Sequence, residues 1–315
     1  MARRHAGVVA ASSQFSIALV WSLIRGVLIL VAVLLVVLVL MAGALTHHVI
    51  TAHNDAEPVN PSTYLLNSYV PLNFADGDGV EHEGWLLLGL RKAPTIILSH
   101  GYNSNRSDLL ALGTILRENH FNVYIFNYAG AKGKDRASDF GDRQVAILLD
   151  AIRTVTKQHG VNPGRVGLFG VSAGGYASLV AAEQIPAVKA LVVDTLYEDP
   201  LQMFDAELDA LLGGSSPVFR FIAGKEFHLF DARSKPYPLR EALPKLGGLP
   251  KLFISGKDMP ALANVTEDLY SRAPQPKRLL VLEHSQPTLA YGAEKKEYEN
   301  QVLSFFLENL SLRAD

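Results

Sequence analysis

The sequence predicts an α/β domain with a mostly parallel central sheet and helices on both faces, preceded by one transmembrane helix. Short apolar segments typical of buried strands alternate with longer segments of helical periodicity, which is the pattern of such a sheet. Polar residues follow several of these strands, where parallel sheets carry their chemistry. Near the N-terminus, residues 26–45 form an unbroken apolar run. As a helix this run would be about 30 Å long, the thickness of a bilayer's hydrocarbon core.

The composition excludes several classes of function. The 315 residues carry a formal net charge of −2 and no stripe of basic and aromatic residues, which argues against binding of nucleic acid. The absence of cysteine excludes disulfides, thiolate metal sites and cysteine nucleophiles. No phosphate-binding loop, His-Glu-x-x-His motif or EF-hand loop occurs. His47, His48 and His53 lack carboxylates at a fixed spacing, and we interpret them as solvated.

The N-terminal region predicts a membrane anchor. We place a cytoplasmic flank at 1–25, the transmembrane helix at 26–46 and a linker at 47–62. Arginines precede the apolar run and no Lys or Arg follows it before Arg91, so the positive-inside rule puts the N-terminus in the cytoplasm and the domain outside. The alternative is a secreted protein, because Ala42-Gly-Ala44 resembles a signal-peptide cleavage site.

Residues 63–315 make up the predicted α/β domain. Strands are expected at 67–74 and 85–90, as a hairpin, and then at 95–99, 122–126, 166–169, 189–193, 251–254 and 278–282. Helices are expected at about 108–119, from about 140, and at 294–310, the last with Tyr298, Val302, Phe305 and Phe306 facing inward. The segment 197–249 breaks this alternation, and we interpret it as a small cap inserted between strands.

The segment Gly170-Val-Ser172-Ala-Gly174 lies between a predicted strand and a predicted helix. In that setting a G-x-S-x-G pattern predicts a sharp turn that exposes Ser172 as a nucleophile at the end of the strand. Gly170 and Gly174 are needed because a Cβ at either position would collide with neighbouring backbone. The backbone N–H of Ala173 would then serve as one donor of an oxyanion hole.

Two further polar residues follow the last two strands in the order that completes a catalytic triad. Asp258 follows the strand at 251–254 and His284 follows the strand at 278–282. A histidine can take the proton of a serine hydroxyl, and a carboxylate on the other ring nitrogen fixes the tautomer. Asp194, also at a strand end, is the alternative acid. The second oxyanion donor is predicted to be the backbone N–H of Tyr102, in the turn after the strand at 95–99.

These residues resemble the α/β-hydrolase superfamily. His100-Gly-Tyr, Gly170-Val-Ser-Ala-Gly, Gly256-Lys-Asp and His284 match its landmarks in order, and the hairpin with Asp78-Gly79 and Gly84-Trp85-Leu86 resembles the membrane-anchored Bem46 and serine aminopeptidase-like groups. The resemblance implies a serine hydrolase, most simply carboxylesterase-like, that cleaves an ester, thioester or amide of a small or lipid-derived acyl substrate. It also implies an acyl-serine intermediate and no metal or organic cofactor.

One segment departs from this family pattern, and it leaves the substrate open. Where many relatives carry Asp-Tyr-Arg-Gly, this chain has Asn127-Tyr-Ala-Gly, followed by Lys132, Lys134 and Arg136. These cations would either meet an anionic substrate or lie in a solvated loop. A peptidase, an acyltransferase and a non-catalytic binding protein of the same fold are the alternatives, and the oligomeric state is not indicated.

Overall fold

The computed structural model describes residues 3–51, 61–64, 69–130, 140–230, 237–285 and 291–310, with side chains in the first range from Leu19 onward. Within these residues nine strands form one sheet in the order β1-β3-β5-β4-β6-β7-β8-β9, with β2 paired to β3. The strands are β1 (Tyr69–Pro71), β2 (Phe74–Ala75), β3 (Glu81–Leu87), β4 (Thr95–Ser99), β5 (Asn122–Gly130), β6 (Val166–Val171), β7 (Val188–Asp194), β8 (Lys251–Gly256) and β9 (Lys277–Leu282).

The sheet is mostly parallel, as the sequence predicted. The strands from β5 through β4, β6, β7 and β8 to β9 all pair in parallel. Only the edge formed by β1, β2 and β3 is antiparallel. The predicted hairpin is present there, with Tyr69 opposite Leu87. Its second strand begins at Glu81 rather than at residue 85, because Ala75 and Glu81 pair directly across the turn.

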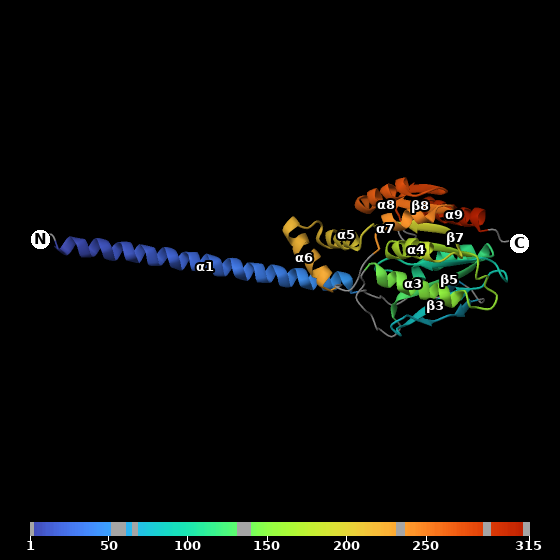
Figure 1. Ribbon diagram of the computed structural model, residues 1–315, viewed down its shortest axis with the longest axis horizontal. Coiled ribbons are helices and arrows are strands. Elements are labelled where there is room, and N and C mark those ends of the chain that lie inside the picture. The colour runs from blue at the N-terminus through green and yellow to red at the C-terminus, as the bar shows by residue number, and fades with distance from the viewer. Residues whose placement is uncertain are drawn as a thin grey trace.

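Helices cover both faces of the sheet. One face carries α3 (Asp142–Val155), α4 (Ala173–Gln184) and α8 (Pro260–Arg272), and the other carries α2 (Leu110–Glu118) and α9 (Gly292–Asn309). Side chains of β4 alternate between the two cores, with Ile97 on the first face and Ile96 and Leu98 on the second. The four α9 residues predicted to face inward, Tyr298, Val302, Phe305 and Phe306, are all buried. The layered arrangement is visible in Figure 1.

The region predicted as a cap forms helices between β7 and β8. They are α5 (Pro200–Leu212), α6 (Pro217–Phe230) and α7 (Leu239–Ala242), followed by the short 3-10 helix η4 (Leu243–Leu246). Asp199 caps α5 by accepting a hydrogen bond from the N–H of Leu201, and α5 ends at Gly213, which has a φ of 67°. Asp and Gly are the residues that favour these two positions. The cap is thus built from regular helices rather than from loops.

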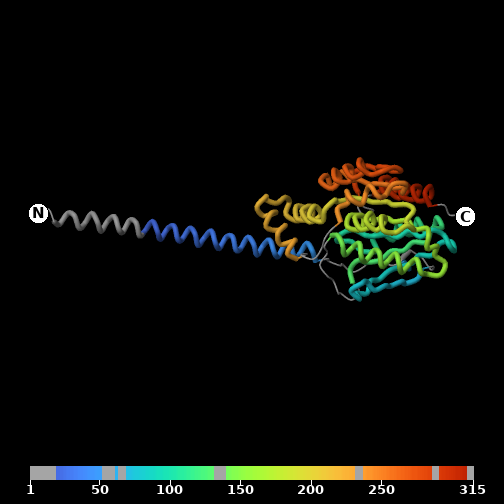
Figure 2. Tube along the Cα trace, viewed as in Figure 1, coloured from blue at the N-terminus to red at the C-terminus, as the bar shows by residue number. Residues whose placement is uncertain are grey.

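A single helix, α1 (Arg3–Ile50), contains the predicted transmembrane segment. Its window of highest hydropathy averages 3.3, which among the described residues makes it the one helix long and apolar enough to cross a bilayer. Figures 1 and 2 show α1 projecting from the rest of the molecule, with only its C-terminal end against the cap. There Ala42, Thr46, Val49 and Ile50 are buried. The helix therefore continues past residue 46, into the stretch predicted as linker, and its end packs as part of the domain.

We predict that Phe306→Ala lowers the free energy of unfolding by about 3–5 kcal/mol, the usual cost of truncating a buried phenylalanine. Phe306 is fully buried, and a Cβ added at Gly167 of β6 would lie 2.8 Å from its ring. Urea unfolding of the full chain in detergent, followed by circular dichroism, measures the change. Leu307→Ala is the matched control, because Leu307 is the next residue of α9 and is 41% exposed. Equal losses in the two variants would contradict the packing described.

Candidate active site

Ser172 lies at the turn between β6 and α4 with φ of 50° and ψ of −115°. A positive φ costs a non-glycine residue about 1–3 kcal/mol, and such strain persists only where the surroundings enforce it. The N–H of Ser172 donates to the carbonyl of Asp194 on the neighbouring strand, at 2.9 Å. Its own carbonyl accepts from the N–H of Tyr176 in the first turn of α4, also at 2.9 Å. The turn is therefore held on both sides.

The two glycines of the turn lie where side chains have no room. A Cβ at Gly170 would lie 2.1 Å from the carbonyl oxygen of Gly174, and a Cβ at Gly174 would lie 2.3 Å from the carbonyl oxygen of Ser99. Both atoms belong to backbone, which cannot rotate away. Only glycine at both positions lets α4 start this close to β4 and β6. This is the crowding that the sequence pattern predicted.

The cap covers the hydroxyl of Ser172. Met203 of α5 places its Sδ 3.4 Å from the Ser172 Oγ, and Ser172 is buried. Among the described residues this sulfur is the hydroxyl's hydrogen-bond contact. A thioether is a weak acceptor and no base, so this contact shields the hydroxyl without activating it.

His284 and Asp258 follow adjacent parallel strands, as expected, and their backbones are close. The strands β8 and β9 end in register at Gly256 and Leu282. The Oδ1 of Asp258 accepts hydrogen bonds from the N–H of Ser285 at 3.0 Å and from its hydroxyl at 3.4 Å. The carboxylate of Asp258 thus lies against the residue that follows His284.

The ring of His284, however, pairs with a different carboxylate. Its Nδ1 lies 3.0 Å from the Oε2 of Glu294, in the first turn of α9, and its backbone N–H donates to Oε1 of the same group at 2.9 Å. The hydrogen bond to Glu294 raises the pKa of His284, while hydrogen bonds from His284 lower the pKa of Glu294. The sequence did not indicate Glu294, because nothing in the spacing shows that the start of α9 returns to the histidine.

Asp194, the alternative acid, is engaged elsewhere. Its Oδ2 accepts the hydroxyl of Tyr298 at 2.6 Å, and the hydroxyl of Thr195 donates to its Oδ1 at 2.8 Å. Asp194 is fully buried. In this arrangement the carboxylate joins the end of β7 to α9. Ser172 and His284 share no hydrogen bond within the described residues, and residues 286–290, which follow the histidine, lie outside them.

Of the two predicted oxyanion donors, Ala173 follows Ser172 in the chain, and Tyr102 follows Gly101, which lies beside Ser172 in space. Ala173 is the first residue of α4, and Gly101, beside Tyr102, would place a Cβ 3.4 Å from the Cβ of Ser172. His100 stabilises the turn at residues 100–102 through both of its ring nitrogens. Its Nε2 accepts from the N–H of Tyr128 at 3.1 Å, so its Nδ1 carries the proton and donates to the carbonyl of Gly101 at 2.8 Å.

Tyr102 joins this turn to the end of α1. Its hydroxyl donates to the carbonyl of Val49, near the end of α1, at 2.6 Å, and its ring packs edge-on against Phe140. Burial, followed by the charge of Glu207, raises the pKa of Tyr102 to about 12, against an opposing hydrogen bond from Asn103. Burial likewise raises the pKa of Glu207 to about 7. Glu207 is one helical turn from Met203 on α5. The sequence did not predict that Glu207 would lie near the site.

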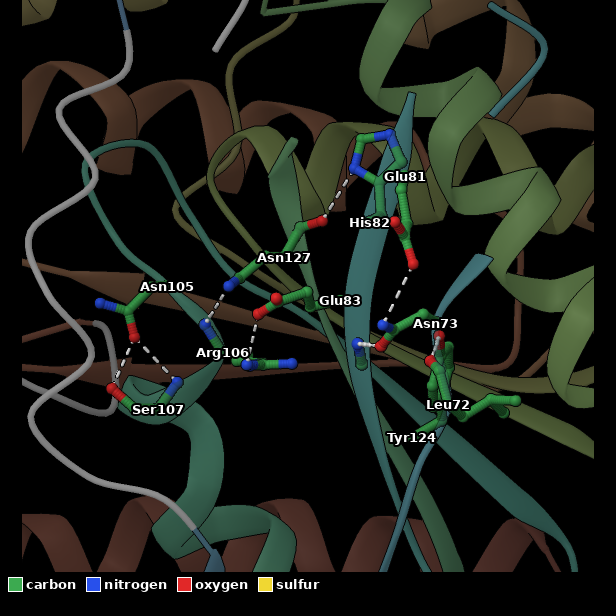
Figure 3. A network of polar contacts seen from close by, with 11 residues as sticks. Leu72, Asn73, Glu81, His82, Glu83, Asn105, Arg106, Ser107, Tyr124 and Asn127 are labelled. Atoms are coloured by element: carbon green, nitrogen blue, oxygen red, sulfur yellow. Dashed lines mark hydrogen bonds and ion pairs between the residues drawn. The ribbon is translucent and has the colours of Figure 1, made fainter. Parts of the chain in front are cut away.

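A polar network joins β3 and β5 to the segment at residues 105–107 (Figure 3). The side chain of Asn127 accepts the N–H of Arg106 at 2.8 Å, and its carbonyl lies 3.1 Å from the Nδ1 of buried His82. The guanidinium of Arg106 pairs with Glu83 at 2.8 Å and stacks on Trp85. Asn127 therefore fixes the segment after the turn at residues 100–102. Lys132, Lys134 and Arg136 lie outside the described residues.

A search of the described residues for metal ligands gives no group of three or more His, Asp or Glu side chains that could hold an ion. The polar groups gathered at the carboxyl edge of the sheet are instead a hydroxyl, an imidazole and carboxylates. These groups can carry out nucleophilic and acid–base chemistry.

Comparison with known proteins agrees with this architecture. The chain is 28% identical over 254 residues to the protein YfhR of Escherichia coli O157:H7, covering 76% of this chain and 81% of YfhR. It is 24% identical over 159 residues to the thiohydrolase aneE of Aspergillus aculeatus, covering 46% of this chain and 50% of that protein. The esterase Pf2001 of Pyrococcus furiosus superposes with a TM-score of 0.65 at 16% identity, over 83% of this chain and all of that one.

The family assignment depends on a family model that matches more than half of the chain. Residues 96–300 match the alpha/beta hydrolase family, a range that begins in β4 and ends within α9. It contains the Ser172 turn, the cap, and the segments that carry Asp258 and His284. With the sheet order, the strained serine and this match together, the chain belongs to the alpha/beta hydrolase family.

Proposed function

We propose that this protein is a membrane-anchored serine hydrolase that cleaves an ester, thioester or amide of a small or lipid-derived acyl substrate. The observation that carries the proposal is the backbone of Ser172, strained to a positive φ at a strand-to-helix turn under the cap. Fold alone does not establish an activity. A strained serine at the N-terminus of a helix, beside backbone N–H donors, is placed to act as a catalytic nucleophile.

In the proposed reaction the Oγ of Ser172 attacks the substrate carbonyl as the Nε2 of His284 takes its proton. The negative charge that develops on the carbonyl oxygen is stabilised by the N–H groups of Tyr102 and Ala173. Collapse expels the leaving group, which receives the proton from His284, and leaves an acyl-serine. Water activated by the same histidine then releases the acid. A carboxylate on Nδ1 keeps Nε2 free to accept the proton.

Two carboxylates compete for that last role. Glu294 holds Nδ1 in the structure, and Asp258 lies against the backbone N–H of Ser285. We assign the catalytic role to Asp258, because it follows a parallel strand at the same edge of the sheet as Ser172. In this scheme a rotation of the half-exposed His284 side chain moves Nδ1 from Glu294 to Asp258, and Glu294 holds the ring in a resting position.

The location that we propose places the hydrolase domain outside the cytoplasmic membrane, with α1 as an uncleaved anchor. The burial of Ala42, which precedes the alternative cleavage point, supports retention of the helix. Cleavage after Ala44 would remove Ala42 from the core and Gly43 from its contact with Glu226. The fold neighbour named as an esterase and the relative named as a thiohydrolase support acyl-transfer chemistry to water. A peptidase or an acyltransferase would use the same residues.

We predict that Ser172→Ala lowers turnover of p-nitrophenyl acetate on the order of a million-fold, the scale for deleting such a nucleophile. The assay uses the full chain in detergent, since the end of α1 packs into the domain. A fluorophosphonate probe should label Ser172, as mapped by peptide mass spectrometry. Ser271→Ala, on the exposed side of α8, should leave both results unchanged. Label on another serine, or unchanged turnover in Ser172→Ala, would refute the assignment and favour a non-catalytic binding protein.

We predict that Asp258→Asn lowers turnover by about 10⁴-fold, the effect of replacing a triad carboxylate by an amide.

Glu294→Gln should instead shift the pH profile. The Glu294 hydrogen bond raises the pKa of His284, and the base works only when unprotonated. Removal of the charge therefore moves the acid limb of kcat/KM to lower pH. The profiles of the two variants and the parent chain measure this. A large loss in Glu294→Gln with little loss in Asp258→Asn would make Glu294 the acid.

A further inference from the structure

The turn that joins α5 to α6 presents an apolar tip. Leu211 and Leu212 at the end of α5, and Val218 and Phe221 at the start of α6, are 41% to 66% exposed. No charged residue stands between Asp209 and Arg220. Exposed apolar side chains gathered in this way on a surface mark a contact with another apolar phase. We refer to residues 210–221 as the cap tip.

Arg220, inside the cap tip, and Asp209, directly before it, neutralise each other's charge. The guanidinium of Arg220 donates two hydrogen bonds to the carboxylate of Asp209, at 2.9 and 3.0 Å. The hydroxyl of Ser215 donates to the same carboxylate at 2.6 Å. A paired and hydrogen-bonded carboxylate loses less on leaving water than a free one. The amine of Lys225 lies 5.5 Å from the ring of Phe221, where a cation can remain in the headgroup region.

The cap tip is carried on the helix that packs against α1. The hydroxyl of Thr46 reaches the carbonyl of Ala223 on α6, and Glu226 of α6 lies against Gly43 of α1. Figure 1 shows α5 and α6 at the end of the domain that faces the N-terminus of α1, with their connecting turn extending back along it. The cap tip is therefore on the side of the domain from which the apolar part of α1 emerges.

The length of α1 sets the level of the bilayer. The apolar run begins at Gly26, directly after Arg25, and about 30 Å of helix carries it to Leu45. Gly43 lies about 3 Å inside that end, and it contacts α6. Burial of α1 side chains by the cap starts still earlier, at Leu38. The cap therefore reaches the depth at which the membrane meets water.

We propose that the cap tip inserts into the interface of the same lipid bilayer that α1 spans, so that the hydrolase domain is held at the membrane by two attachments. The inference rests on the proposed anchoring of α1. The occupant is a lipid surface rather than another protein, because the cap tip lies on the side of the domain from which the exposed apolar part of α1 projects (Figure 1). Its uncharged backbone turn, flanked by a neutralised ion pair and a lysine, matches the polarity gradient of that interface.

The chain contains no cysteine, so a single introduced cysteine is a unique labelling site. We would attach nitrobenzoxadiazole to Leu212→Cys and, separately, to Val218→Cys in the full chain. The labelled chains are reconstituted in vesicles of phosphatidylcholine and phosphatidylglycerol, with and without doxyl-labelled phosphatidylcholine. Leu35→Cys in α1 reports insertion of the anchor. Leu90→Cys is the matched control, since Leu90 is also about half exposed but lies beyond β3, at the edge of the sheet opposite the cap.

The labels at 212 and 218 should lose about half or more of their fluorescence to doxyl lipid and emit at shorter wavelength than the label at 90. Quenching at 35 with none at 212 and 218 beyond that at 90 would overturn the cap-tip proposal and leave the anchor intact. Absence of quenching at 35 as well would overturn both. Neither result bears on the catalytic assignment, which is read from turnover.

Discussion

The crowding around Ser172 is the constraint on which the rest of the structure depends. The backbone can take its positive φ only because Gly170 and Gly174 let β6, α4 and β4 approach within contact distance. The cost of that conformation, about 1–3 kcal/mol, has to be met by the surrounding fold. The parallel strands supply the rigidity, since the N–H of Ser172 is bonded to Asp194 on β7. A strained serine and a well-packed sheet are therefore two aspects of one arrangement.

Helix α1 and the candidate site are joined by direct contacts. The end of α1 packs against α6, and the carbonyl of Val49 accepts the hydroxyl of Tyr102, whose backbone N–H we assign to the oxyanion hole. Helix α5 of the same cap places Met203 on the Ser172 hydroxyl. Movement of the cap against α1 would thus be felt at both the nucleophile and the oxyanion turn.

Two carboxylates lie near His284, but only one of them holds its side chain. Glu294 is hydrogen-bonded to both the ring Nδ1 and the backbone N–H of His284. The hydrogen bond to the ring raises the pKa of the imidazole. Asp258 instead holds the next residue, Ser285. A protonated ring cannot act as a base, so the Glu294 pairing favours a resting form and its release favours an active one. The two carboxylates therefore have separate uses in the proposed mechanism.

The sequence by itself determined the parallel sheet, the helices on its two faces, the cap between β7 and β8 and the Ser172 turn, because these features follow from local periodicity and from glycines at fixed spacing. It also showed the apolar length of α1. Only the tertiary structure decided that the end of α1 belongs to the core, that Met203 covers the serine and that Glu294 holds His284. These contacts join residues distant in the chain, and their partners are chosen by how helices dock, which no local pattern records.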